Sequence, residues 1–260
     1  MLRQHLLFAT LLAVVFLRCV TPARESSEER KPVYVVRRAD SAPALDGRWG
    51  GPVWRGADTL AVTHFLPEST EGLPDSGHRP KTEARVLYDA KGLYVRFRVK
   101  DRYVRSVETE YHGRVWEDAA AEFFVQPKAE RGYFNFEINC GGTMLLSYHE
   151  NPGYQGPVAR KDGGVPWELA SQVVIEHSMP EVVDPEMTEP VEWHIAYFVP
   201  FALLEAYVGP LGDVSGQVWG ANFYKIAETN SHPHFGAWSP ILEGVNFHSP
   251  QFFGVIRFSD

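Results

Sequence analysis

The feature that most constrains the fold of this chain is the stretch from Thr82 to Asp101, where apolar and mostly polar residues alternate. The alternation is interrupted once, by the turn-forming sequence Asp89-Ala90-Lys91-Gly92. Because successive side chains of a β-strand point to opposite faces, a period of two on both sides of a turn is typical of a β-hairpin. The stretch therefore predicts two antiparallel strands with one packed face and one face toward water.

A second hairpin is predicted further along the chain, with arms from Ala120 to Gln126 and from Gly132 to Asn139. In its second arm, apolar residues occupy one face and more polar residues the other. The two sets are Phe134, Phe136 and Ile138 against Tyr133, Asn135, Glu137 and Asn139. We therefore expect a row of polar groups on the face of this strand that does not join the core.

More short strands and a single short helix complete the prediction. The strands are expected at Val33 to Arg38, Thr59 to Phe65, Thr143 to His149, Ser171 to His177, Glu192 to Val199, Val218 to Ile226 and Phe253 to Phe258. Pro200 to Tyr207 indicates the helix, since proline is favoured in a first turn and Gly209 follows as a stop. Many short strands without βαβ alternation are typical of the all-β class. We expect an antiparallel, jelly-roll-like β-sandwich of about a dozen strands with at most one short helix.

The N-terminus has the composition of a secretion signal. Arg3 and His5 precede an apolar run from Leu6 to Leu17, which is shorter than the roughly 20 residues needed to span a bilayer. We predict a signal peptide at 1–23, a flexible charged tether at 24–31 and one folded domain at 32–260. The expected location is secreted or periplasmic, outside the cytoplasm.

Two cysteines bear on this prediction. Cys19 leaves open the alternative that the protein is a lipoprotein, which is the only membrane attachment that we consider. Arg18 argues against it, because lipid attachment sites normally have a small residue directly before the cysteine. Cleavage after Ala23 would leave Cys140 as the only cysteine of the mature chain. A single cysteine cannot form an internal disulfide, so Cys140 is expected to be a buried thiol.

Charge and composition narrow the range of ligands. The formal net charge of −8 and the absence of long basic clusters disfavour nucleic acid and anionic lipid, which are bound through clustered Lys and Arg. Aromatic residues make up 13% of the chain. They suit a neutral ligand that offers hydroxyls and apolar ring faces, and sugars fit that description.

The order of the sequence motifs resembles a known family. The run Leu45-Asp46-Gly47 followed by Trp54, then TEARVLYDAKGLYVRFRVKD, VWEDAAAEFFVQP, YFNFEIN, EWHIAYFVPFALL, WGANFYKI and AWSPILEGVNFHSPQFFGVIRF, is similar to family 9 carbohydrate-binding modules and their DOMON-like relatives. The resemblance spans Val33 to Asp260. It implies a non-catalytic protein that holds a mono- or oligosaccharide in an aromatic slot, in association with a glycoside hydrolase and polysaccharide catabolism.

The resemblance also implies which residues hold the sugar. Two aromatic side chains clamp a terminal ring in the sugar-binding members, and these positions fall on Trp116 and on Phe247, where such members have Trp. Trp238 is the fallback for the second clamp, although a core position suits it equally. Glu122 matches an acidic strand residue that bonds sugar hydroxyls. A loop-anchoring role for Trp116 and a solvated position for Glu122 remain open.

Further polar readers are expected on neighbouring strands. Glu137 occupies a position where the family can show Arg, so an Arg-to-diol contact is lost there and the identity of the sugar is put in doubt. Asn139, Asn222 and Tyr224 are weaker candidates. Some members bind structural calcium through loop carboxylates, and the chain offers Asp46, Asp89, Asp101 and Asp118 for such a site. No other cofactor is expected.

Three other functions stay open at this point. A glycoside hydrolase would need two carboxylates across a cleft, and Glu117, Asp118, Glu122 and Glu137 are available. A b-type haem, as held by some DOMON-like relatives, could use Met144 with His149, His194 or His248. A zinc site at His232 and His234 is the weakest, because a lone H-x-H in a loop is usually solvated.

Overall fold

The predicted hairpin is present as β4 (Lys81–Tyr88) and β5 (Gly92–Asp101), with Ala84 paired opposite Phe97. Its second face is not simply exposed to water, because Tyr94 and Arg96 on that face are buried. Residues 39–46 and 48–57 cover them, and the Arg96 guanidinium carbon lies 4.5 Å from the centre of the Trp54 ring. The expectation of one wet face is therefore wrong for this part of β5.

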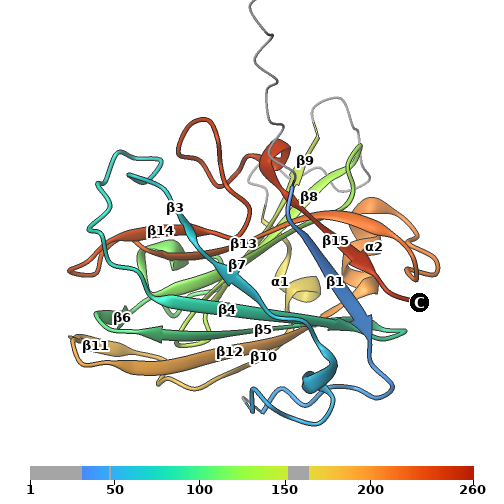
Figure 1. Ribbon diagram of the computed structural model, residues 1–260, viewed down its shortest axis with the longest axis horizontal. Helices are drawn as coiled ribbons and strands as arrows, with labels where there is room; N and C mark the ends of the chain where they lie inside the picture. Colours follow the sequence, from blue (N-terminus) through green and yellow to red (C-terminus); the bar gives the residue numbers. More distant parts are fainter. Residues whose placement is uncertain (1–30, 47, 152–163) are drawn as a thin grey trace, which may run out of the picture. The chain divides into compact units, whose positions relative to one another are not determined.

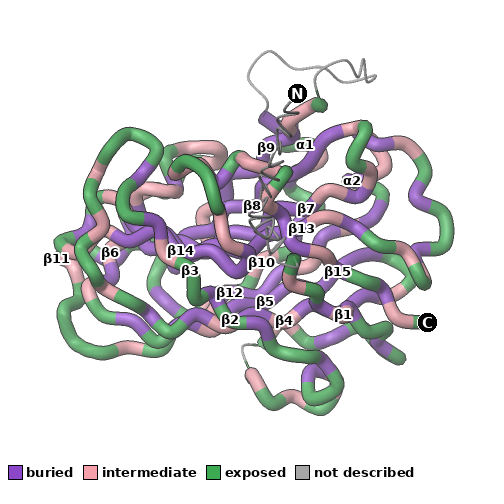
Figure 2. Tube along the Cα trace, turned by 45° about the horizontal axis from the view of Figure 1, so that its top comes forward, coloured by how far each residue is buried: buried purple, intermediate pink, exposed green. Residues whose placement is uncertain are grey.

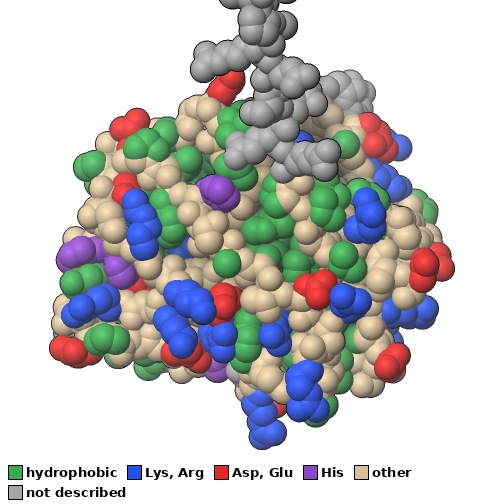
Figure 3. All heavy atoms as spheres, in the orientation of Figure 1, with side chains coloured by type: hydrophobic (Ala, Val, Ile, Leu, Met, Phe, Trp, Pro, Cys, Tyr) green, Lys and Arg blue, Asp and Glu red, His purple; other side chains and the backbone are tan. Residues whose placement is uncertain are grey.

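Arginines fill the uncovered part of the same face. The guanidinium carbons of Arg85 and Arg98 lie 4.5 and 4.3 Å from the Trp49 ring. Figure 3 shows Lys and Arg side chains gathered in the lower part of this view, where β4 and β5 run. Arg98 also pairs with Glu83 at 2.6 Å, so part of this positive charge is balanced locally.

The computed structural model describes residues 31–46, 48–151 and 164–260, and Lys31–Asp260 form one compact unit. The predicted signal peptide at 1–23, Cys19 and the tether up to residue 30 lie outside the described residues. In the described ranges, no helix is long and apolar enough to cross a membrane.

Fifteen strands are found in the described part of the chain. Besides β4 and β5 they are β1 (Val33–Arg38), β2 (Leu60–Val62), β3 (His64–Phe65), β6 (Val104–Ser106), β7 (Ala120–Lys128), β8 (Gly132–Asn139), β9 (Met144–Glu150), β10 (Val174–His177), β11 (Val183–Met187), β12 (Val191–Pro200), β13 (Val218–Ala227), β14 (His234–Ala237) and β15 (Gly254–Phe258). Three 3₁₀ turns are η1 (Trp54–Gly56), η2 (Val115–Glu117) and η3 (Pro250–Phe252).

The strands form two packed layers that are continuous through β1 (Figure 1). The order is β10-β12-β5-β4-β1-β15-β13-β7-β8-β9, with β14 on β13, β3 on β14 and β2 on β4, while β6 and β11 form a separate pair. β1 runs parallel to both β15 and β4, whereas the other pairs among the described strands are antiparallel. This confirms the all-β sandwich.

Aromatic residues from both layers meet in the core. The ring centres of Phe97 (β5) and Phe223 (β13) are 6.0 Å apart, and those of Phe136 (β8) and Tyr197 (β12) are 6.3 Å apart. Figure 2 shows the buried residues concentrated along the strands and the exposed ones in the connecting loops. Cys140 belongs to this core as a free, buried thiol, as predicted, and burial raises its pKa to about 12.

The helix expected after Pro200 is α2 (Phe201–Val208), and it ends at Gly209 with a φ of 73°. A positive φ is a backbone conformation that glycine adopts without steric cost, so Gly209 stops the helix. A second helix, α1 (Trp167–Ala170), was not predicted, since four residues are too few to show a period. The short strands β6, β11 and β14 were missed for the same reason, and β11 also contains Pro185.

Candidate functional site

A concave cavity of about 330 Å³ lies over the outward face of β7, β8 and β9. The strands supply its floor, and the walls come from η2, the end of β13 and the loops that carry Glu71 and Phe247. The lining residues are Thr70, Glu71, Trp116, Glu122, Asn135, Glu137, Leu145, Ser147, His149, Ile226, Glu228, Asn246, Phe247 and His248. Four predicted residues, Trp116, Glu122, Glu137 and Phe247, are therefore brought together in one cavity.

Strand register explains how the floor forms. Glu122 of β7 lies opposite Glu137 of β8, which in turn lies opposite Leu145 of β9. One step along the same face, Asn135 lies opposite Ser147. Directly opposed side chains on one face are about 5 Å apart at Cβ, so these rows bring Glu122, Glu137, Asn135 and Ser147 together on one surface, beside Leu145. The opposite face of β8, with Phe134, Phe136 and Ile138, is packed into the core as predicted.

The pair Glu122 and Glu137 dominates the electrostatics of the floor. Burial and the neighbouring Glu137 raise the pKa of Glu122 well above its ordinary value of 4.5. Burial raises the pKa of Glu137 to about 7; a hydrogen bond from Asn135 Nδ2 to Glu137 Oε1, at 2.6 Å, opposes this rise, and Glu228 adds to it. Two buried carboxyls so close cannot both ionise at low cost, so the pair retains a proton at pH values where an exposed carboxyl has lost it.

A third carboxyl faces the same space from the wall. The pKa of Glu228 is raised to about 7 by burial and by the charges of Glu71 and Glu117, against the opposing effect of Arg114. Arg114 itself is engaged with Glu117 at 2.6 Å. The cavity is therefore acidic on its floor and on one wall.

Several buried polar atoms of the floor have no hydrogen-bond partner among the described residues. They are Asn135 Oδ1, Glu137 Oε2 and His149 Nε2. Asn135 is 1% exposed and Glu137 5% exposed, so bulk water does not readily satisfy them. Buried polar groups without a partner are rare in folded proteins because each costs about 1–3 kcal/mol. The floor therefore presents atoms that a polar ligand could satisfy.

Aromatic rings bound the cavity. Phe247 stacks on Tyr224 with ring centres 4.1 Å apart and planes 14° apart, and the Tyr224 hydroxyl donates to the Phe247 carbonyl oxygen at 3.0 Å. Trp116 stands on η2, partly buried, with the Arg114 guanidinium carbon 5.7 Å from its ring centre. Phe247 is thus fixed in orientation before any ligand arrives.

Histidines line another part of the cavity. The rings of Tyr133 and His149 stack with centres 4.9 Å apart, and the Tyr133 hydroxyl bonds His248 Nδ1 at 3.0 Å. Burial and the neighbouring His149 lower the pKa of His248 to about 4. Burial and His112 lower the pKa of His149. Both imidazoles are therefore neutral at pH 7 and do not offset the carboxyls.

The model of carbohydrate-binding family 9 matches residues 65–258. The chain belongs to carbohydrate-binding family 9. Among solved structures, it is similar to a candidate carbohydrate-binding protein from Bacteroides uniformis ATCC 8492, at 26% identity and a TM-score of 0.71, covering 88% of this chain and 100% of the other.

Two solved structures of a family 9 module from Caldicellulosiruptor kristjanssonii share the fold, each at 10% identity and a TM-score of 0.56. The module in complex with cellotriose covers 88% of this chain and 94% of its own, and the module in complex with glucose covers 86% and 95%. No curated protein gives a significant match.

The other predicted site residues of this family 9 domain lie outside the cavity. Trp238 is in the core, with its ring edge-on to Phe223 at 5.6 Å. Asn222 is buried, and its side chain bonds the backbone N–H and carbonyl of Ser239 at 2.9 and 3.1 Å. Asn139 donates to Asp118 Oδ2 at 2.9 Å and to the Glu108 carbonyl at 3.0 Å. Tyr224 acts beneath Phe247 rather than on the surface of the cavity.

Sequence reasoning did not select the remaining lining residues for a sugar site, and it offered His149 and His248 only as haem ligands. Asn135 carries a usable signal, because it shares the polar face of its strand with Glu137 two residues later. Ser147 and His149 lie on a strand whose register against β8 could not be deduced from the sequence. Glu71 and Glu228 come from loops distant in sequence, and no motif connects them to the floor.

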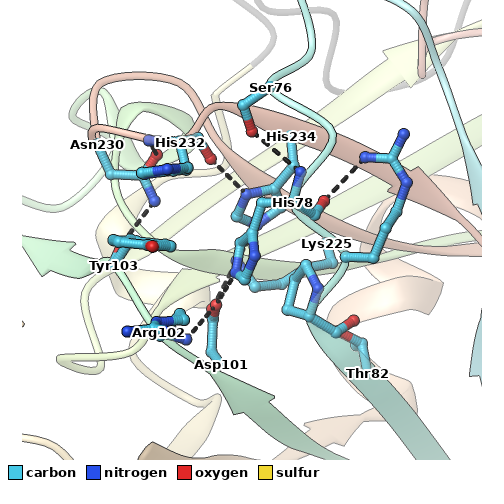
Figure 4. Close-up of polar contacts among 12 residues, drawn as sticks. Ser76, His78, Thr82, Asp101, Arg102, Tyr103, Lys225, Asn230, His232 and His234 are labelled. Atoms are coloured by element: carbon cyan, nitrogen blue, oxygen red, sulfur yellow. Dashed lines mark hydrogen bonds and ion pairs between the residues drawn. The ribbon is translucent and has the colours of Figure 1, made fainter. Parts of the chain in front are cut away.

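A second polar cluster closes one end of the sandwich (Figure 4). Lys225 of β13 is fully buried and bonds His234 Nε2 at 2.9 Å, with Asp101 Oδ2 at 3.5 Å. The other oxygen of Asp101 bonds His78 Nε2 at 2.7 Å. His232 stacks on Tyr103 with ring centres 3.5 Å apart. The cluster ties β5, β13, β14 and the loop of His78 together.

The predicted metal ligands do not form a site in the described residues. No group of three or more His, Cys, Asp or Glu side chains there is arranged to hold a metal ion. Each aspartate offered for calcium serves protein groups instead. Asp46 accepts from Arg48 N–H, Asp89 from Lys91 and Gly92 N–H, Asp101 from Arg102 N–H, and Asp118 from Val107 and Glu108 N–H. His234 Nε2, offered for zinc, is taken by Lys225.

The residues offered for haem are also divided. Met144 packs into the core on the inward side of β9, whereas His149 and His248 line the outward cavity. His194 lies on β12, on the other layer of the sandwich. These residues therefore do not face one another as a pair of axial ligands for a haem iron.

Proposed function

We propose that this family 9 domain binds a mono- or oligosaccharide, presented as a chain end, in the cavity between Trp116 and Phe247 and does not cleave it. The observation that carries the proposal is the combination of unpartnered buried polar atoms on the floor with aromatic rings on the walls. Sugars need both, because their C–H faces pack on aromatic rings while their hydroxyls need polar partners.

The comparisons support a sugar ligand. Family 9 modules of the same fold are known in complex with cellotriose and with glucose. A cavity of about 330 Å³ lies within the size range of small-molecule sites and is small for a long polymer. We infer that one or two sugar rings enter it.

The positions of the carboxyl groups support binding without hydrolysis. A glycoside hydrolase holds its acid and its base or nucleophile on either side of the scissile bond, roughly 5 to 9.5 Å apart. Glu122 and Glu137 are direct cross-strand neighbours on one floor. Asp118 is occupied by the N–H groups of Val107 and Glu108, and Glu117 pairs with Arg114. These positions favour a binding surface.

We further infer that the protein acts outside the cytoplasm, exported by the segment 1–23 and soluble after cleavage near Ala23. There it would deliver or retain polysaccharide fragments for a glycoside hydrolase. N-terminal sequencing of the exported form tests this, and a lipid-blocked Cys19 would place the protein on a membrane instead.

Calorimetric titration with glucose, cello-oligosaccharides and xylo-oligosaccharides tests the binding proposal. Trp116→Ala is expected to weaken binding by roughly 1–3 kcal/mol while the melting temperature changes little. Trp167→Ala is the matched control, since Trp167 is 58% exposed and does not line the cavity. Activity on aryl glycosides, or equal loss of affinity in both variants, would overturn the proposal.

A further inference from the structure

The cavity has a charge imbalance that a neutral sugar would not relieve. Its described lining residues include the four carboxyls of Glu71, Glu122, Glu137 and Glu228 and no lysine or arginine. The nearest cations are already engaged. Arg114 pairs with Glu117 at 2.6 Å. The Lys225 ammonium bonds His234 Nε2 at 2.9 Å, donates to the carbonyl oxygen of Ile226 at 2.9 Å and lies 3.5 Å from Asp101.

The remaining titratable groups facing the cavity do not supply positive charge. His149 and His248 stay neutral near pH 7 because burial lowers their pKa values. Tyr133 stays protonated because burial raises its pKa. Burial raises the pKa values of Glu122, Glu137 and Glu228, so these carboxyls keep protons that they would release to a ligand that brings the missing positive charge.

The free atoms of the floor are mainly acceptors. Asn135 Oδ1 can only accept a hydrogen bond, and it has no partner among the described residues. Glu137 Oε2 lies two residues along the same face, also unpartnered, and the Glu122 carboxyl lies directly across from Glu137. Three acceptor groups thus converge on one part of the floor. A hydroxyl donates one hydrogen bond, whereas an ammonium group donates three and carries the missing charge.

We propose that the preferred ligand is an amino sugar, whose protonated amine lies on Asn135, Glu137 and Glu122 while its ring packs against Phe247. This rests on the proposed carbohydrate function and specifies its ligand class. An acetylated amine would lack the charge and two of the donors, so the free amine is required. The stacking of Phe247 on Tyr224 holds one wall of the slot beside this acceptor group.

The pH dependence follows from the carboxyls of the floor. Glu137 has a pKa of about 7, so acidification toward pH 5 protonates it and removes charge that the ammonium would meet. Binding of an amino sugar should therefore weaken about fivefold or more between pH 7 and pH 5, with proton release on binding at the higher pH. Binding of a neutral sugar should change much less.

Calorimetric titration of the full chain with glucosamine, N-acetylglucosamine and glucose at pH 7 tests the proposal. We expect glucosamine to bind at least tenfold more tightly than the other two. Glu137→Gln and Glu122→Gln should each remove most of this preference, since glutamine keeps the shape and loses the charge. Glu176→Gln on β10, an exposed glutamate far from the cavity lining, should keep it.

The outcomes separate the two proposals. If glucose or N-acetylglucosamine binds as tightly as glucosamine, the amino-sugar inference is wrong and the carbohydrate function stands. If a glucosamine preference persists in both glutamine variants while they melt like the wild type, the charge does not come from this floor and the inference also fails. If glucosamine does not bind while a cello- or xylo-oligosaccharide does, only the amino-sugar inference fails, and if none of these sugars binds, both proposals fall.

Discussion

Glu122 and Glu137 face each other across the β7–β8 pair, buried on the floor of the same cavity. Like charges directly opposite one another destabilise a sheet, so this arrangement costs folding free energy whenever both groups ionise. A pair retained at such a cost is more readily explained by binding than by stability.

The first prediction concerns the pH dependence of stability. The pKa of Glu137 rises from 4.5 to about 7 on folding, so the folded state binds more protons between these values. The stability contribution of this group is therefore largest below pH 4.5 and is lost as the pH rises through 7. Glu137→Gln should be more stable than the wild type at pH 8 by on the order of 2 kcal/mol, and less different near pH 5. Urea titrations at both pH values measure the free energies of unfolding. The same difference between the two proteins at pH 5 and at pH 8 would contradict the prediction.

The second prediction concerns the size of the aromatic wall. Phe247→Trp should enlarge the surface offered to a sugar ring and tighten binding by about 1 kcal/mol, roughly fivefold. Phe247→Leu should weaken binding by at least as much, because it loses the ring and its stacking on Tyr224. Calorimetry with the best ligand of the panel gives both values. Equal affinities in all three proteins would show that Phe247 does not contact the ligand.

The third prediction concerns acid sensitivity at the opposite polar cluster. Burial acts to raise the pKa of Asp101, but Lys225 and the bond from His78 lower it from 3.8 to about 2. A lowered carboxyl pKa contributes stability above pH 3.8 and loses it as the pH falls through 2. Asp101→Asn should cost about 3 kcal/mol at pH 7, since it leaves Lys225 buried without its partner. The difference from the wild type should shrink toward pH 2, which denaturant titrations would detect.

The fourth prediction concerns the domain boundary. Deleting residues 1–31 should change the free energy of unfolding by less than about 1 kcal/mol, because the first backbone bond of the sheet uses the carbonyl of Pro32, which accepts from Val255 N–H at 2.9 Å. Deleting residues 1–36 should prevent folding, because it removes Tyr34 and Val36 from the core. Circular dichroism and urea titration compare the two truncations. A large loss in the shorter deletion would move the boundary toward the N-terminus.

Much of the fold could be predicted because the alternation of apolar and polar residues can be read within a short stretch of sequence. The arms of both long hairpins and the helix after Pro200 carry their signal within about 20 residues. The parallel pairing of β1 could not be predicted, since Val33 pairs with Val255, 222 positions later, and Arg37 with Leu87, 50 positions later. For the same reason the cover over Tyr94 and Arg96 was missed, because it comes from the distant segment around Trp54.

The site residues likewise fall into those that the sequence could predict and those that it could not. The alternation of β8 places Asn135 and Glu137 on one face, and the family resemblance led to Trp116, Glu122 and Phe247. Whether a polar residue on that face reaches a ligand depends on its neighbours in space. Asn139 has the correct alternation and is nonetheless taken by Asp118 at the strand end. His149 and Glu228 enter the cavity only through strand register and loop packing, which the sequence does not encode locally.

The position of β1 has a consequence for the order in which the protein can fold. Val33 to Val36 pair with Val255 to Phe258, so the strand made earliest among the described elements is completed by the one made last. The two layers therefore cannot be joined until nearly the whole chain has been synthesised, and contacts of such long sequence separation form slowly. We therefore expect such a chain to reach its folded state later after synthesis than one whose paired strands lie close together in sequence.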